Sequence, residues 1–448
     1  MLVTKAIPRS VVFGTAVFAI VYFTLDLNRY FVYDTSLDFF LFAQGVADRS
    51  GLLRTGFAGS HFGDHFSPIY DLVVPLGALV GSPIALIAFQ TVAAALTAPG
   101  LFRIASRFVS QALAVRIAML ALVYPPFAGI VFGDPSEACF APAATVWLFA
   151  FVLERRWVAA AVVAALALAI KEDQAIFLMF DGIVAIALAV RTGDVALRRF
   201  AVAIVATAAI VLASFLFVIQ PAIIGRSVWG ALSVVSQAAP SDPSGGRSIW
   251  GRVGYLAEML VPLAFLPIVG WRVLVFAIPS LAEVLLARNS AVWSMGEHYA
   301  GVWIGYVLIA GTYGAYVLAR KSPNLARRFV DAALVICVAN LIFASPTHWR
   351  RHLRLPSDHD RALDATIASV MAKPATIGTQ DELLSHLWSD PGARYGLRSS
   401  PHYALIDTSI RDSFMGRKMS EDIAIHRYGR YRRLSVVNGI ALFERSGP

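Results

Sequence analysis

Long apolar segments separated by short polar ones dominate the first 346 residues of the chain. A helix needs roughly 20 apolar residues to cross a membrane, and several segments reach or approach this length. The pattern predicts about eleven membrane-spanning helices, at residues 10–29, 84–102, 117–133, 138–153, 157–170, 174–190, 201–222, 253–270, 273–288, 299–319 and 329–346. The sequence therefore indicates an all-α polytopic membrane domain over residues 1–346.

Charged residues in this domain fall into two sets that alternate along the chain. One set is basic, and the other is acidic or mixed with histidine. Because cytoplasmic loops carry the excess of Lys and Arg, we expect the basic loops inside and the mixed clusters outside. An odd number of spans then places the N-terminus inside and the C-terminus outside. The basic set is Lys5, Arg9, Arg103, Arg107, Arg116, Arg155, Arg156, Arg191, Arg198, Arg199, Arg272, Arg320, Lys321, Arg327 and Arg328.

Two of the expected outer segments are long. Residues 30–83 are too polar to span, and their apolar part from Ser67 to Val80 is too short. We therefore expect an interfacial or re-entrant helix there, ended by Gly81, Ser82 and Pro83. Residues 223–252 are rich in Gly, Ser and Pro and predict a loop.

Residues 347–448 have the composition of a soluble module. PATIGT and HYALID are typical of short buried strands, and DELLSHLW and SEDIAIHRYG of helices. SVVNGIALFE predicts a hairpin that turns at Asn438-Gly439. We expect a small extracytoplasmic α/β module at this end.

Composition agrees with a membrane protein. Of the 448 residues, 58% are hydrophobic and only 15% are charged. The net charge of +9 is spread over short loops instead of one patch, which argues against nucleic-acid binding. Cys139 and Cys337 lie in or beside apolar segments, so we expect them to be unpaired.

Asp34 and Asp38 follow the first apolar segment. Their spacing would place both carboxylates on one helical face, and a carboxylate at a dry membrane boundary is a candidate general base. A solvated loop with an aspartate helix cap is the alternative. His61, Asp64 and His65 form a second cluster. We expect this cluster to form hydrogen bonds or to position substrate. A divalent metal, which the i, i+4 spacing of the histidines would suit, or a simple loop is the alternative.

Lys171, Glu172 and Asp173 interrupt an apolar stretch, which is costly unless they meet water or a polar cavity. Lys171 suits a phosphate as a point-charge partner, whereas a snorkelling lysine in a hairpin is the alternative. Asp134 and Glu137 open another outer turn. Asp181 and Glu258 lie within apolar stretches, where Asp181 suits a proton relay or pairing with a polar neighbour. Further candidates for an anionic substrate, or ordinary loop charges, are Arg226, Arg247 and Arg252.

Four motifs carry a resemblance to a known family: LDFFLFAQG, HFGDHFSPIYDLVVPL, FGDPSEA and KEDQAIF. Together they resemble the membrane family called domain of unknown function 2079, which is grouped with the GT-C glycosyltransferases. The resemblance extends over most of the chain, including TQDELLSHLW and HYALID. It implies a GT-C fold with an acidic residue at the start of the first outer loop, best matched by Asp38. Asp34 is an unmatched neighbour.

The resemblance also implies an activity. We expect an inverting glycosyltransferase at the outer face of the cytoplasmic membrane, with a polyprenyl-phosphate-linked sugar as donor and a cell-envelope glycan, lipid or protein as acceptor. Asp38 would be the base and Lys171, with Arg226, would neutralise the phosphate. The sugar or phosphate would be positioned by His61, Asp64, His65, Glu172 and Asp173. A transporter or lipid flippase that uses Asp181 and Glu258 is the alternative.

Overall fold

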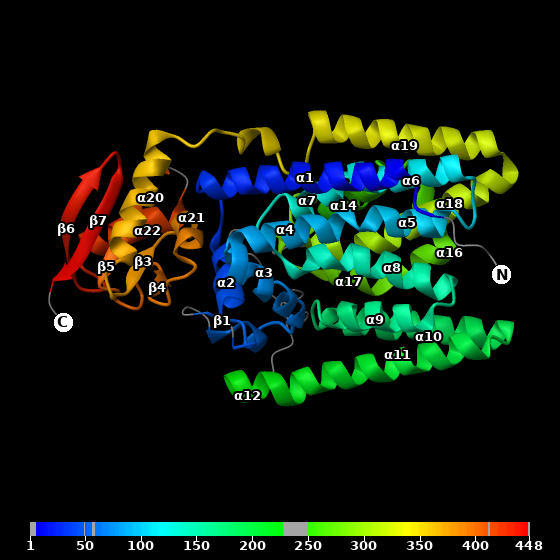
Figure 1. Cartoon of the computed structure of the whole chain (residues 1–448), viewed down its shortest axis with the longest axis horizontal. Coiled ribbons are helices and arrows are strands. Elements are labelled where there is room, and N and C mark those ends of the chain that lie inside the picture. The colour runs from blue at the N-terminus through cyan, green and yellow to red at the C-terminus, as the bar shows by residue number, and fades with distance from the viewer. Residues whose placement is uncertain (1–5, 49, 56–58, 227–248, 411–412, 447–448) are drawn as a thin grey trace. The chain divides into compact units, whose positions relative to one another are not determined.

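The computed structural model describes residues 6–446 except 49, 56–58, 227–248 and 411–412, and most of these residues are helical (Figure 1). The chain forms two compact units, which are described separately. Unit 1 comprises Met1–Tyr22, Phe62–Ile69 and Phe89–Trp349, and unit 2 comprises Phe23–His61, Tyr70–Ala88 and Arg350–Pro448. Helices α1 (Arg9–Phe31) and α4 (Ser82–Ala95) belong in part to each.

Unit 1 is a bundle of apolar helices. Figure 1 shows α10 and α11, two of its longest helices, running side by side. The helices are α5 (Thr97–Ala105), α6 (Gln111–Val123), α7 (Pro125–Val131), α8 (Ala141–Leu153), α9 (Trp157–Leu168), α10 (Asp173–Thr192), α11 (Val195–Ser214), α12 (Gln220–Ile224), α14 (Ile249–Leu260), α15 (Leu266–Val269), α16 (Trp271–Leu274), α17 (Ile278–Leu286), α18 (Gly301–Lys321) and α19 (Pro323–Phe343).

Helix α18 is the centre of this bundle. It packs against α5, α8, α15 and α16 and is buried on nearly all sides, as expected for a helix that is apolar all round. Its small residues allow close approach. A methyl group added at Gly314 would lie 2.0 Å from the Leu266 carbonyl oxygen, and one added at Gly270 would lie 2.0 Å from that of Ala310. Glycine at both positions therefore permits the contact between α18 and the α15–α16 corner.

Five helical segments among the described residues are long and apolar enough to cross a membrane. They correspond to five expected spans: Arg9–Phe31, Ser82–Ala105, Asp173–Thr192, Val195–Ile224 and His298–Lys321. A sixth arises if α6 and α7, which meet at a bend of 48°, are counted as one span.

The other expected spans are short, broken or more polar. Helix α8 has 13 residues and α9 has 12. Residues 253–288 are divided among α14 to α17. Pro262 follows the end of α14, and Pro267 and Pro279 lie in the first turns of α15 and α17, where proline can start a helix but cannot continue the preceding one. Phe265, before α15, adopts a positive φ of 57°. The count of eleven is not confirmed by the helices of the described chain.

Unit 2 contains a five-stranded sheet in the order β4-β3-β5-β7-β6. The strands β3 (Ile377–Thr379), β4 (Ala393–Tyr395) and β5 (Tyr403–Asp407) are parallel, and β6 (Arg430–Val437) and β7 (Ile440–Ser446) form an antiparallel hairpin beside β5. The strands expected in PATIGT and HYALID are present as β3 and β5. The hairpin turns at Asn438-Gly439 as predicted, with positive φ at both residues.

Helices and loop residues complete unit 2. Its helices are α2 (Leu37–Ala47), α3 (Val74–Val80), α20 (Asp358–Met371), α21 (Asp381–Leu384) and α22 (Phe414–Ala424), and β1 (Arg54–Thr55) pairs with β2 (Gly59–Ser60). Tyr33 and Phe40 share a buried cluster with Leu363, Ile377 and Leu405. The first outer segment thus contributes to the core around the sheet. Helix α3 ends at Val80, and Gly81, which follows it, has a φ of 90°.

Candidate active site

The charged turn between α9 and α10 is the structural centre of the candidate site in unit 1. Helix α9 ends at Leu168 and α10 begins at Asp173, so Lys171 and Glu172 lie in the turn itself. The segment 62–69 is joined to this turn, since the Ile69 amide donates a hydrogen bond of 2.8 Å to the Ala169 carbonyl. The segment that carries Asp64 and His65 thereby meets the KED motif.

Glu172 binds this segment through both carboxylate oxygens. Its fully buried side chain accepts from His65 Nδ1 and from the Phe66 amide, each at 2.9 Å. Burial and Lys171 act to lower the pKa of His65, but the carboxylate of Glu172 outweighs them and the pKa is raised. Burial acts to raise the pKa of Glu172, whereas His65, Lys171 and the Phe66 amide lower it overall. Both shifts favour the buried ion pair of a protonated His65 with a charged Glu172.

Lys171 is surrounded by acidic side chains. Its ammonium nitrogen lies 3.5 Å from Asp173 Oδ2 and 4.0 Å from Glu137 Oε1, and its side chain is 15% exposed. Burial alone would lower the pKa of Lys171, but the neighbouring carboxylates raise it well above its usual value. Lys171 therefore stays charged across the physiological pH range.

A small cavity of about 20 Å³ lies beside Lys171. Its lining includes Glu137, Asp173, Glu283 and His298. Glu283 and His298 were not among the residues predicted for the site. Glu283 stands within the apolar run IPSLAEVLL, so its signal in the sequence was the same as that of Asp181: an acid where a spanning helix was expected.

Asp34 and Asp38 do not share a helical face, contrary to the expectation from their spacing. Ser36 caps α2, so the helix begins at Leu37 and leaves Asp34 outside it. Asp34 Oδ2 instead accepts from His352 Nδ1 at 2.6 Å and from Arg29 Nε at 3.2 Å. Burial acts to raise the pKa of Asp34, but these two partners lower it overall. Asp38 is exposed in the first turn of α2.

His61 and His65 have different surroundings. Residues 61–63 form a single turn of 3-10 helix, and the chain from Asp64 to Ser67 is not helical. The His61 ring packs against Phe42 and Tyr70 within unit 2, with ring centroids 5.2 Å and 6.4 Å away. Asp64 is exposed in unit 1, where His65 Nε2 lies 3.8 Å from its carboxylate. In the part of the chain that is described, no three His, Cys, Asp or Glu side chains form a group suited to a metal ion.

The expected loop arginines have different surroundings. Arg226 is exposed just after α12, and Arg247 lies outside the described residues. Arg252 belongs to α14 and donates to the carbonyls of Leu285 and Ala287. The prediction that Arg252 is a loop residue is therefore wrong, because the residue lies in a helix. Its guanidinium binds the backbone at the end of α17.

Other single predictions have clear outcomes. The Asp181 carboxylate accepts a hydrogen bond of 2.9 Å from the Tyr306 hydroxyl, which confirms pairing with a polar neighbour. Cys139 and Cys337 are both buried free cysteines, as expected.

Residues 33–357 match the family described as predicted membrane proteins of domain of unknown function 2079. The chain belongs to this family. No curated protein has a sequence close enough to this chain to count as a relative.

The fold is similar to that of ArnT from Cupriavidus metallidurans. The crystal structure of ArnT from Cupriavidus metallidurans bound to undecaprenyl phosphate aligns over 97% of both chains, with 13% identity and a TM-score of 0.55. The apo structure of the same protein aligns over the same shares of both chains, with 12% identity and a TM-score of 0.54. At this level of identity the similarity shows the fold alone, so this family member shares the overall fold of ArnT.

The buried pair of His65 and Glu172 predicts a pH-dependent stability. A histidine whose pKa is raised in the folded state contributes its full stabilisation below pH 6.5, the ordinary histidine pKa. This contribution is lost as the pH rises through the raised pKa of the folded protein. We expect the thermal midpoint of the wild type to fall between about pH 6 and about pH 8. Glu172→Gln should flatten this fall, and should itself lower the midpoint because breaking a buried pair costs about 3–5 kcal/mol.

A matched control is Glu444→Gln. Glu444 also faces a histidine, His402 at 3.6 Å, but both side chains are partly exposed. Surface pairs contribute little, so this variant should leave the wild-type pH profile unchanged. Equal profiles for the wild type and Glu172→Gln, measured by differential scanning fluorimetry, would contradict the assigned pair.

Proposed function

We propose that the protein is an inverting membrane glycosyltransferase that uses a sugar linked to a polyprenyl phosphate. The observation that carries this proposal is the GT-C fold shared along 97% of the chain with an enzyme whose structure contains undecaprenyl phosphate. The buried charged turn at Lys171 supports it, because such a cluster within an apolar helical body is typical of a functional site.

The proposed reaction is a single displacement. The oxygen of an acceptor hydroxyl attacks the anomeric carbon, the bond between that carbon and the phosphate oxygen breaks, and the electron pair leaves with the polyprenyl phosphate. Asp38 takes the proton of the hydroxyl. Asp38 is the better candidate base because Asp34 is held by Arg29 and His352 with its pKa lowered.

Lys171 is the proposed partner of the departing phosphate. It remains charged, and its two carboxylate contacts of 3.5 Å and 4.0 Å are longer than a direct hydrogen bond. An ammonium group has three donors, so it can reach a phosphate oxygen while Asp173 keeps its orientation. Glu172 holds His65 beside this turn, and His65, Asp64 and His61 would position sugar or phosphate, with Arg226 adding positive charge.

The acceptor in this proposal is a cell-envelope glycan, lipid or protein. The donor chain would remain in the bilayer, for which the apolar surface of the helices is suited. The site would face the outside of the cytoplasmic membrane, because the basic residues of the sequence belong to the opposite set of loops.

Membrane orientation gives a testable prediction. Ser399 is exposed in unit 2, and both native cysteines are buried, so one added cysteine supplies the reactive thiol. Ser399→Cys should be labelled by a membrane-impermeant maleimide in intact cells, whereas Arg199→Cys, exposed near the basic start of α11, should require permeabilisation. The reverse pattern would overturn the outer-face site.

Asp38→Asn should lower the rate of sugar transfer by about 10²–10⁴-fold, because it removes a proton acceptor at nearly constant shape. Asp71→Asn is the matched control, since Asp71 is also an exposed aspartate of the first outer segment. A purified transfer assay measures both. Undiminished turnover by Asp38→Asn would remove Asp38 from the mechanism.

Lys171→Met keeps most of the apolar stem and deletes the charge. We expect the rate constant to fall about 10²–10³-fold and donor affinity to fall less, since the cation matters most as the phosphate leaves. Lys321→Met, at the exposed end of α18, should transfer sugar normally. Normal transfer by Lys171→Met would refute the phosphate role. A wild type that transfers no sugar but moves a solute across proteoliposomes would favour a transporter.

A further inference from the structure

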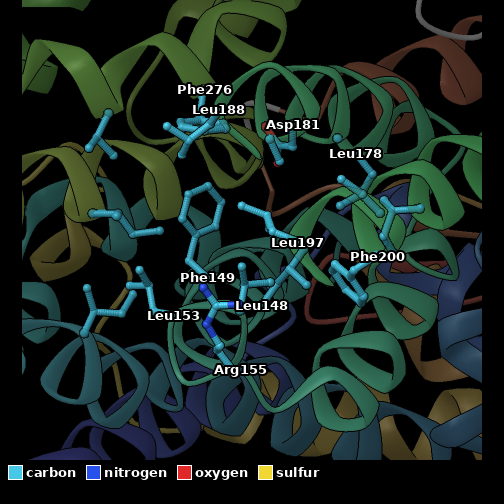
Figure 2. A pocket seen from close by; sticks show the side chains of 18 of the residues that line it. Leu148, Phe149, Leu153, Arg155, Leu178, Asp181, Leu188, Leu197, Phe200 and Phe276 are labelled. Carbon is cyan, nitrogen blue, oxygen red and sulfur yellow. The ribbon is translucent and has the colours of Figure 1, made fainter. Parts of the chain in front are cut away.

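A large apolar pocket lies within unit 1, away from the charged turn. Its volume is about 430 Å³, within the usual range for a ligand pocket. Side chains from α8, α10, α11 and α18 surround it, and Figure 2 shows Phe149, Leu178, Leu197 and Phe200 around the same space. Apart from a few polar groups, the lining is aliphatic or aromatic and therefore suits a hydrocarbon chain.

Polar groups mark two sides of this pocket. Asp181 is buried and Oδ2 accepts from Tyr306, while Oδ1 has no hydrogen-bond partner among the described residues. Arg155 lies on the other side of the space in Figure 2. Its guanidinium is exposed and binds the Asp194 carboxylate through two nitrogens, with the Trp157 ring 5.8 Å away.

The length of α10 separates Arg155 from the candidate site. The helix has 20 residues and is therefore about 30 Å long, close to the thickness of the bilayer hydrocarbon. Asp173 begins the helix beside Lys171, whereas Asp194, the partner of Arg155, follows its other end. The pocket begins at about mid-helix, near Asp181, and extends toward Asp194.

A lipid with its phosphate at Arg155 therefore belongs to the leaflet opposite Lys171. Five arginines are exposed at this end, in the loop after α8 and around the α10–α11 turn. Basic residues at a membrane surface attract anionic lipids. The five are Arg155, Arg156, Arg191, Arg198 and Arg199.

We propose that the pocket binds one anionic phospholipid from the leaflet opposite Lys171, with an acyl chain among Phe149, Leu178 and Phe200 and the phosphate at Arg155. A guanidinium has five N–H donors, so Arg155 can bind a phosphate oxygen without releasing Asp194. This site is independent of the proposed sugar transfer, because its ligand reaches the protein from the other membrane boundary.

Asp181 distinguishes this ligand from another class of lipid. A plain acyl chain has no hydrogen-bond donor for Oδ1, whereas a chain with a hydroxyl group could donate to it. If the hydroxyl decides binding, Asp181 is essential and Arg155 is not. If the phosphate determines binding, as proposed, Arg155 is essential and Asp181 is not.

Native mass spectrometry of the full-length protein tests the proposal, with phosphatidylglycerol and phosphatidylcholine of identical chains as probes. The wild type should retain one phosphatidylglycerol in preference to phosphatidylcholine. Arg155→Gln should reduce this preference about fivefold, the effect of one basic residue at a membrane surface. Asp181→Asn should leave the preference unchanged.

Two matched variants on α10 test the pocket itself. Ala185 lines the pocket, whereas Ala187 is exposed on the same helix and is not part of the lining. Ala185→Phe should reduce lipid retention strongly, and Ala187→Phe should not. Leu197→Trp, which fills the pocket from α11, replaces Ala185→Phe if the latter does not purify as a single species.

Three results would overturn the proposal. Equal retention by Ala185→Phe and Ala187→Phe would mean that the lipid lies outside the pocket. Equal retention of the two phospholipids by the wild type would exclude recognition of an anionic headgroup. Loss of retention in Asp181→Asn, with Arg155→Gln unchanged, would identify a hydroxylated amphiphile instead.

Discussion

Compensation of buried charge is the constraint on which the candidate site depends. A charge removed from water within an apolar body is stable only when an opposite charge and hydrogen bonds replace its hydration. In unit 1, Glu172 satisfies this requirement with His65 and the Phe66 amide, and Lys171 does so with Asp173 and Glu137. These contacts fix the turn between α9 and α10 and attach the segment 62–69 to it.

The same contacts explain which parts of the candidate site could be predicted from the sequence alone. The cost of three consecutive charges in an apolar stretch drew attention to Lys171, Glu172 and Asp173, and the strands β3 and β5 followed from short apolar runs. The pairing of His65 with Glu172 joins residues 107 positions apart, and no local pattern encodes such a distance. Glu283 had a signal in the sequence, as an acid within an expected span, but its position beside Lys171 becomes known only when α17 is placed.

The cap of α2 determines the positions of Asp34 and Asp38 more than their spacing in the sequence does. Asp34 and Asp38 have the spacing of neighbours on a helix, but Ser36 between them starts α2 and separates their environments. Asp34 becomes part of a network with Arg29 and His352, whereas Asp38 remains exposed. The number of spanning helices was difficult to predict because hydropathy does not report where prolines break a helix, as they do between α14 and α17.

The course of the chain between the two units has a practical consequence for dissecting this protein. Unit 2 is assembled from three separate stretches, so the backbone passes from one unit to the other five times, after Tyr22, His61, Ile69, Ala88 and Trp349. Tyr33 and Phe40, from the first of these stretches, fill the core around the sheet. A fragment that begins at residue 347 would lack these side chains and would expose an apolar face to water. The C-terminal segment is therefore a poor candidate for separate expression, and a shorter soluble form would need residues 32–47 linked to it.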